Sequence, residues 1–216
     1  VDCITMGAGL PLWVPAVLDS FSQGKAVAQH FPVESHIPGD NFVMSFNPCE
    51  FFKQARMEMK RPNFLPIVSS DSLASIFLHK ASGSVEGFVV ELPTAGGHNA
   101  PPRGKYLLSE KNEPIYSSRD EVNFQRIADL GLPFWIGGSY ASPQKLLDAR
   151  ALGASGIQAG SIFALCNKSG LDPLLTAEIR SQGFSGNLNI RTDVRASSTG
   201  FPIKVVDLDN TVSNSV

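Results

Sequence analysis

The stretch LPIVSSDSLASIFLHKASGSVEGFVVEL, residues 65–92, is the part of the sequence that decides the fold class. A first apolar run is typical of a buried strand, and Ser70 or Asp71 then stands where a helix N-cap is expected. Apolar residues at helical spacing continue to Gly83, and a second apolar run begins at Phe88. This order predicts one strand–helix–strand unit.

The same alternation continues to the C-terminal side of this unit. Ser118 and Glu121 have the spacing of a capping box, and a further apolar strand is expected over 156–160. We expect three more helices, between Ser118 and Gly131, between Ser142 and Gly153, and between Asp172 and Gln182. Strands that are apolar throughout and separated by helices favour a parallel sheet covered on both faces, so the predicted class is α/β.

The composition excludes several classes of protein. With 43% hydrophobic residues and a mean hydropathy near zero, 216 residues can bury a sizeable core. A net charge of −2 from 18 basic and 20 acidic residues offers no basic field for nucleic acid or anionic lipid. No apolar run approaches the roughly 20 residues that a bilayer requires, and no leader pattern opens the chain, so we expect no membrane partner and a cytoplasmic location.

The three cysteines, Cys3, Cys49 and Cys166, are odd in number and far apart. Such spacing favours neither a disulfide framework nor a zinc site, and we expect buried thiols. The segment HFPVESH offers His30, Glu34 and His36 as metal ligands, but a third firm ligand and a known spacing are lacking. A solvated loop or lid is the stronger interpretation of residues 23–64, with its phenylalanines packing against a helix.

Glycines mark the predicted carboxyl ends of the strands. No dinucleotide-binding turn and no nucleotide P-loop is present. In a (β/α)8 barrel the carboxyl ends of the strands form the active-site rim, and the last two loops commonly bind phosphate through bare backbone N–H groups. Plain tight turns remain the alternative. The glycines are Gly7, Gly9, Gly96, Gly97, Gly137, Gly138 and Gly160.

His98 follows a predicted strand and a glycine pair in GFVVELPTAGGHNAPP, residues 87–102. A histidine on the catalytic rim titrates near neutrality and can take a proton from a carbon acid. The alternative is a loop histidine that is hydrogen-bonded to backbone. Residues 99–118 follow as two short extended runs around a polar turn, a position where barrel enzymes place lids.

Five motifs in a fixed order resemble the nitronate monooxygenase family, formerly called 2-nitropropane dioxygenases. They are ITMGAGLP, PIVSS, GFVVELPTAGGH, PFWIGGSY and LGASGIQAGSIF, and together they cover most of residues 4–166. The family consists of FMN-dependent (β/α)8 barrels, and the resemblance implies that the five strands here correspond to the fourth through eighth. The barrel would then be partial. This agrees with a sequence that begins without methionine inside a predicted strand, and we expect a piece of a longer protein.

The resemblance also implies a domain division and a cofactor site. Residues 1–183 would form the FMN-binding barrel portion, and 184–216 a C-terminal extension whose last residues are disordered. His98 would face the flavin and act on the substrate. Ala95, Gly96 and Gly97 would lie along the isoalloxazine, and the FMN phosphate would be held by Gly137, Gly138, Ser139, Gly160 and Ser161. The family usually reads GTRF where this chain has GSIF, so the hydroxyl is kept and the guanidinium is lost.

The activity that the resemblance implies is oxidation of alkyl nitronates by FMN and dioxygen, giving a carbonyl compound and nitrite. Two alternatives stay open. One is an NAD(P)H-dependent reductase of enoyl thioesters or quinones in a related flavin barrel. The other is an inactive barrel fragment with a structural or binding role, since an arc of five strands leaves two open edges. The sequence leaves the physiological substrate and the oligomeric state open.

Overall fold

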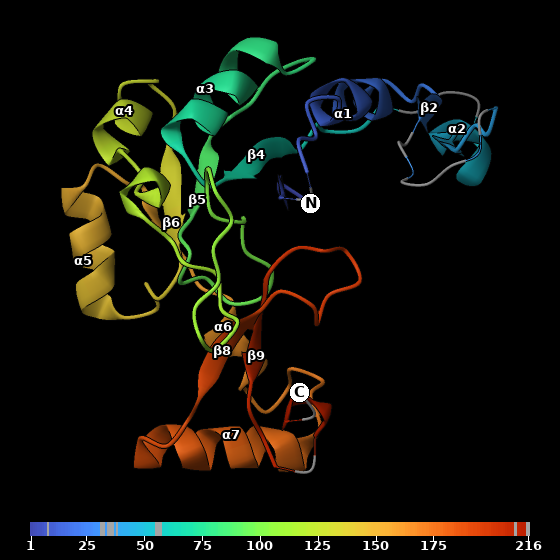
Figure 1. Cartoon of the computed structure of the whole chain (residues 1–216). Helices are drawn as coiled ribbons and strands as arrows, with labels where there is room; N and C mark the ends of the chain where they lie inside the picture. Colours follow the sequence, from blue (N-terminus) through green and yellow to red (C-terminus); the bar gives the residue numbers. More distant parts are fainter. Residues whose placement is uncertain are drawn as a thin grey trace. The chain divides into compact units, whose positions relative to one another are not determined.

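The computed structural model describes residues 1–7, 9–30, 33, 37, 39–54, 58–209 and 211–214 (Figure 1). The chain divides into two compact units. Unit 1 comprises Val1–Pro66 with Ile76–Gly87, and unit 2 comprises Ile67–Ser75 with Phe88–Val216. None of the helices in the described ranges has the length and apolar character needed to cross a bilayer.

Five strands pair in parallel, each with its neighbours along the chain. In a doubly wound sheet the strand order reverses at one point. Here the order of the five strands in the sheet follows their order in the sequence, so the winding is that of a (β/α)8 barrel. The α/β class and the five predicted strand–helix units are thereby confirmed, and β1 and β7 are the end strands of a partial barrel. The order is β1 (Cys3–Met6), β4 (Asn63–Val68), β5 (Phe88–Glu91), β6 (Phe134–Gly137) and β7 (Gly156–Gln158).

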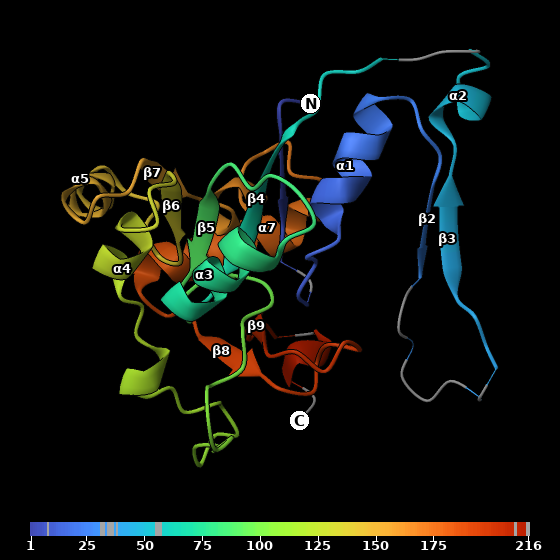
Figure 2. The ribbon, with the colours of Figure 1, turned by 90° about the horizontal axis from the view of Figure 1, so that it is seen from above.

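The helices between these strands pack apolar side chains on the sheet. In unit 2, α4 and α5 lie on one face of β5, β6 and β7 (Figures 1 and 2). The ring of Phe124 stacks on that of Phe134 with centroids 6.2 Å apart, and Ile127 is fully buried. The helices of this kind are α3 (Asp71–Lys80), α4 (Phe124–Ala128) and α5 (Pro143–Ala151), and two further helices, α6 (Ser161–Ala164) and α7 (Pro173–Ser185), follow β7.

The predicted capping box at Ser118 and Glu121 is wrong by one residue. Ser117 and Asp120 form the box instead, around the 3-10 turn η1 (Ser118–Asp120), and the Asp120 carboxylate accepts from the Ser117 N–H at 2.7 Å. Glu121 has extended backbone and lies outside the turn. Helix α4 begins only at Phe124, where the Asn123 side chain accepts from the Arg126 N–H at 3.0 Å.

Residues 23–64, predicted to be a solvated loop or lid, contain an antiparallel strand pair in unit 1 (Figure 2). Phe46 meets Phe21 of α1 edge-on at 5.6 Å, which confirms that an aromatic of this segment packs on a helix. The elements of this region are α1 (Val14–Ser22), β2 (Val27–His30), β3 (Val43–Phe46) and α2 (Pro48–Phe51).

Residues 184–216, predicted to be an extension, fall in unit 2 and contain an antiparallel hairpin. Its strands are β8 (Ile190–Asp193) and β9 (Ile203–Val206), and a 3-10 turn, η2 (Val212–Asn214), follows. The boundary at 183/184 and the disorder of the last residues stay predictions.

The cysteines differ from expectation in their burial. Cys3 and Cys166 are exposed and Cys49 is half-buried, and all three are free thiols. The prediction of buried thiols is wrong for Cys3 and Cys166, and Cys3 is exposed because it begins β1, an end strand that only β4 covers.

Candidate functional site

The loop after β5 is tied to β6 from its first residue. Glu91 lies level with Gly137 in the strand register, and the Leu92 N–H donates to the Gly137 carbonyl at 3.0 Å. A tight turn follows, in which the Ala95 N–H donates to the Leu92 carbonyl at 2.9 Å. Ala95 is buried, so the predicted cofactor loop begins with its backbone fixed against the sheet.

The β6 turn packs directly on this loop through a glycine. Gly138 has φ +112, a backbone that L side chains rarely adopt. A Cβ there would lie 2.9 Å from the Thr94 Oγ1 and 3.0 Å from the Ala95 nitrogen. Ser139 also has a left-handed backbone, φ 59, and its hydroxyl donates to the Thr94 carbonyl at 3.3 Å. Such strain in a residue other than glycine is concentrated at functional sites.

The turn after β7 also meets the loop after β5. A Cβ on Gly96 would overlap the Ser161 Oγ, and one on Gly137 would lie 3.1 Å from the Gln158 Oε1. Gly97 and Gly160 differ from these, since a Cβ on either would meet open space. The turns after β5, β6 and β7 therefore converge, with two bare backbone segments left accessible beside the contacts. Gly7 and Gly9 belong to unit 1.

His98 lies in a short strand that adds to the C-terminal hairpin. The Lys204 N–H donates to the Gly97 carbonyl at 2.9 Å, and the Asn99 N–H donates to the Pro202 carbonyl at 2.8 Å. His98 pairs with Ile203 between them. The His98 side chain is exposed, and its Nε2 lies 2.6 Å from the Ser197 Oγ. The described hydrogen bond of the imidazole therefore goes to the loop between β8 and β9 and not to a glycine turn.

Ser197 is itself held in place. Its hydroxyl lies 2.7 Å from the Thr199 Oγ1 and accepts from the Thr199 N–H at 3.2 Å. A fixed acceptor or donor beside one ring nitrogen selects the tautomer of a neutral histidine. The hairpin thus orients the imidazole, a role that no sequence motif near His98 indicates.

Asn99 is a second residue that the sequence did not single out. Its side chain is 2% exposed, and its Nδ2 donates to the Ala95 carbonyl at 2.9 Å. The other end of the amide, Oδ1, is buried and has no hydrogen-bond partner in the described part of the chain. Buried acceptors are normally satisfied, so this oxygen is an unused acceptor within the described residues.

Glu91 is the titratable group at the carboxyl end of β5. Burial raises its pKa from 4.5 to about 7, because desolvation disfavours the carboxylate. Its side chain lines a cavity of about 10 Å³ together with Ser69, Arg103, Tyr116 and Asp120, room for about one water. Burial raises the pKa of Tyr116 to about 12, and its hydroxyl donates to the Ala100 carbonyl at 3.0 Å.

The predicted lid has the expected local form. Leu108 pairs with Pro114, and the Ser109 N–H donates to the Glu113 carbonyl at 2.8 Å, so two extended runs surround a turn as predicted. The segment is tied to η1, since the Arg103 backbone N–H donates to the Asp120 carboxylate at 2.7 Å. Burial alone would raise the pKa of Asp120, but hydrogen bonds from the Ser117 and Arg103 backbone lower it. A gating role for this hairpin stays a prediction.

The metal interpretation of residues 30–36 gains no further ligand. The His30 Nδ1 lies 2.9 Å from the Asn41 Oδ1, while Glu34 and His36 lie outside the described residues. Across the described ranges, no group of three or more His, Cys, Asp or Glu side chains is arranged to hold a metal ion.

The fold and the site together define an α/β protein with a parallel sheet and glycine turns gathered at the carboxyl ends of its strands. The chain matches no protein-family model and no curated protein. Two of the solved structures that are similar to it are the following. One is a FabK mutant from Thermotoga maritima, with a TM-score of 0.45 and 19% identity over 67% of this chain and 40% of that one. The other is nitroalkane oxidase from Streptomyces ansochromogenes, with a TM-score of 0.47 and 17% identity over 68% and 39%.

The chain thus spans about 40% of the length of these two proteins. Both TM-scores lie below 0.5, and the α/β class of this chain rests on its own strand order and pairing.

Proposed function

We propose that the converging turns after β5, β6 and β7 bind FMN and that the protein is a flavin-dependent oxidoreductase acting on alkyl nitronates with dioxygen. The observation that supports this most directly is the contact of Gly96 with Ser161 and of Gly138 with Thr94 and Ala95. These glycines let the turns pack closely, and a Cβ on Gly97 or Gly160 would meet open space, so the N–H groups of these two residues can approach a flat or anionic ligand with no side chain between.

Each part of the cluster has a proposed task in holding the cofactor. Ala95–Gly97 would border the ring system, and the unpaired Asn99 Oδ1 would accept a hydrogen bond from a ring N–H. The phosphate would be bound by backbone N–H groups of Ser139 and its neighbours and by the hydroxyl of Ser161, with Gly137, Gly138 and Gly160 allowing the approach. Bound FMN would supply the electron transfer, and the protein positions it.

His98 would hold a ring N–H against the negatively charged nitronate, which has already lost its α-proton. Its ring nitrogen is held by Ser197 at 2.6 Å and its side chain is exposed, so the imidazole is oriented and accessible. The proposed substrate is a small alkyl nitronate, which would be converted to a carbonyl compound and nitrite. This role of His98 is tested by the reduction of bound flavin by the nitronate, because FMN binding itself needs no contact with the imidazole.

The experiment is the visible spectrum of the purified chain after incubation with FMN, followed by anaerobic addition of propionate 3-nitronate and, in a separate sample, of NADPH. We expect bound flavin that is reduced by the nitronate and reoxidised by air. Reduction by NADPH alone would replace the proposal with a reductase, and a cooperatively folded chain that binds no FMN would favour an inactive barrel fragment. His98→Ala should keep FMN and lose reduction by the nitronate.

A further inference from the structure

A second polar cavity lies away from the glycine turns, where the C-terminal hairpin meets the tip of the 107–115 hairpin. Its volume is about 290 Å³, close to the lower end of the range for small-molecule sites. Three cationic and two anionic side chains line it, which leaves one net positive charge. The lining residues are Lys111, Asn112, Arg191, Asp193, Val194, Arg195, Asp207 and Ser213.

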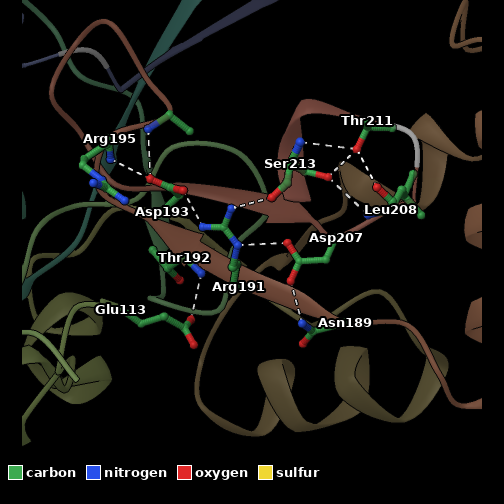
Figure 3. A network of polar contacts seen from close by, with 11 residues as sticks. Glu113, Asn189, Arg191, Thr192, Asp193, Arg195, Asp207, Leu208, Thr211 and Ser213 are labelled. Carbon is green, nitrogen blue, oxygen red and sulfur yellow. Dashed lines mark hydrogen bonds and ion pairs between the residues drawn. The ribbon is translucent and has the colours of Figure 1, made fainter. Parts of the chain in front are cut away.

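Arg191 is the fixed centre of this cavity (Figure 3). Its Nη1 donates to Asp193, its Nε donates to Asp207 at 2.9 Å, and its Nη2 donates to the Ser213 carbonyl at 2.9 Å. The hydrogen bonds to Asp193 and Asp207 raise the pKa of the guanidinium, so Arg191 is charged at all relevant pH values. A guanidinium has five N–H donors, and two remain beyond these three contacts.

The carboxylates of Asp193 and Asp207 already accept hydrogen bonds from neighbouring groups of the protein, so they repel an anionic ligand less than free carboxylates would. Asp193 accepts from the Arg195 N–H at 2.7 Å and the Ala196 N–H at 3.0 Å besides its bond to Arg191. Asp207 also accepts from the Asn189 Nδ2 at 2.6 Å. Figure 3 shows Asp193 and Asp207 on either side of the Arg191 head group, which they hold in one place.

Lys111 and Arg195 supply the charge that is not compensated. Both side chains are exposed, and within the described residues neither one has a hydrogen bond or an ion pair. The Arg195 backbone is nonetheless fixed by its bond to Asp193, and Asn112 has a left-handed backbone, φ 59, at the tip of the facing hairpin. The cavity therefore combines one immobilised guanidinium with two free cationic groups.

We propose that this cavity binds the phosphate group of a small phosphate monoester. A phosphate group presents three strong acceptor oxygens and between one and two negative charges at neutral pH, which match three cationic groups better than a single carboxylate does. The remaining volume accommodates the small organic part. The site is independent of the proposed flavin cluster, since none of its lining residues belongs to the turns after β5, β6 and β7.

The test is titration of the 216-residue chain with ribose 5-phosphate, inorganic phosphate and acetate, followed by calorimetry and by amide shifts of Asn112 and Arg195. We expect saturable binding of both phosphate compounds, about tenfold or more tighter than acetate. The double variant K111A/R195A should weaken it by about tenfold or more. The matched control R150A/K168A removes the same charge at exposed residues elsewhere and should leave it unchanged.

Three outcomes would overturn the proposal. They are no saturable binding of either phosphate compound, equal affinity for acetate, and unchanged binding in K111A/R195A when the melting temperature shows an intact fold. Gly138→Ala separates the two sites, because it should leave ribose 5-phosphate binding intact. If ribose 5-phosphate binding were lost in Gly138→Ala and not in K111A/R195A, the phosphate would bind at the glycine turns and not in this cavity. Failure of FMN to bind would leave this result unaffected.

Discussion

The glycine turns and the C-terminal hairpin are both in unit 2, and they are built on opposite principles. The turns after β5, β6 and β7 meet through backbone and small side chains, so that Gly96 and Gly138 leave no space for a Cβ. The hairpin is instead held by charge, with Arg191 bonded to two carboxylates. His98 belongs to both, because its loop comes from the first and its hydrogen-bond partner Ser197 from the second. Close packing shapes the proposed cofactor site, and the hairpin holds the residue that would act beside it through Ser197.

The charged region should show the largest loss of stability on a single change. Arg191→Ala leaves Asp193 and Asp207 without their main partner, and their side chains are only 8% and 20% exposed. We expect the free energy of unfolding to fall by about 2–3 kcal/mol, measured by urea denaturation. Arg150→Ala, at an exposed position, is the control and should change it by less than about 0.5 kcal/mol. Equal effects of the two changes would show that the hairpin does not depend on its ion pairs.

The glycine region should respond to a single methyl group. Gly138→Ala introduces a Cβ about 3 Å from Thr94, Ala95 and Leu92 at a backbone φ of +112. We expect a loss of about 2 kcal/mol in the free energy of unfolding and weaker FMN binding. Gly170→Ala is the matched control, since it has φ +83 but open space around the new Cβ. It should cost about 1 kcal/mol and leave FMN binding unchanged, whereas similar effects would mean that φ alone matters at Gly138.

Most of the glycine region could be predicted from the sequence, because its signals are local. Apolar runs marked the strands, and Ser142 capped α5 as expected, accepting from the Lys145 N–H at 3.2 Å. The capping box shifted by one residue because Ser117 with Asp120 and Ser118 with Glu121 have the same spacing. The usual capping-box motif ends in Glu or Gln and so favours Ser118 with Glu121, whereas in the structure it is Asp120 that is buried and forms the box.

The rest could not be predicted because it depends on contacts between distant residues. Ser197 meets His98 across 99 positions in the chain, and Arg191 meets Asp207 across 16. Neither pair forms a pattern at helical or strand spacing. The unpaired oxygen of Asn99 also follows from burial alone, and a neutral side chain beside a histidine gives no signal in the sequence.

The two regions should also differ in the sign of their pH dependence. The pKa of Glu91 is raised from 4.5 to about 7, so its contribution to stability is fully present below pH 4.5 and is lost as the pH rises through 7. The pKa of Asp193 is lowered by its bond to Arg191, so its contribution is lost as the pH falls through the lowered value. Glu91→Gln should therefore remove a decrease of about 1–2 kcal/mol between pH 4.5 and 7.

This difference is measured by urea denaturation at several pH values. The acid limb, which the hairpin controls, should be the same in Glu91→Gln and in the unchanged protein. If the variant retained the decrease between pH 4.5 and 7, the carboxyl of Glu91 would titrate near its ordinary value and the burial argument would be wrong.

The smallest effect on stability is expected at Ser197, where the two regions meet. Ser197→Ala removes the hydroxyl that lies 2.6 Å from the His98 Nε2, and since the imidazole is exposed, water replaces the lost partner. The free energy of unfolding should change by about 1 kcal/mol or less. The ring nitrogen shifts of His98 should nevertheless move toward a mixture of tautomers in a 15N-correlated spectrum.

The control is Ser198→Ala, one residue away and exposed, which should leave both the free energy of unfolding and the ring nitrogen shifts unchanged. Because the hairpin acts on His98 through this hydroxyl, unchanged ring shifts in Ser197→Ala would separate the charged region from the proposed active site altogether.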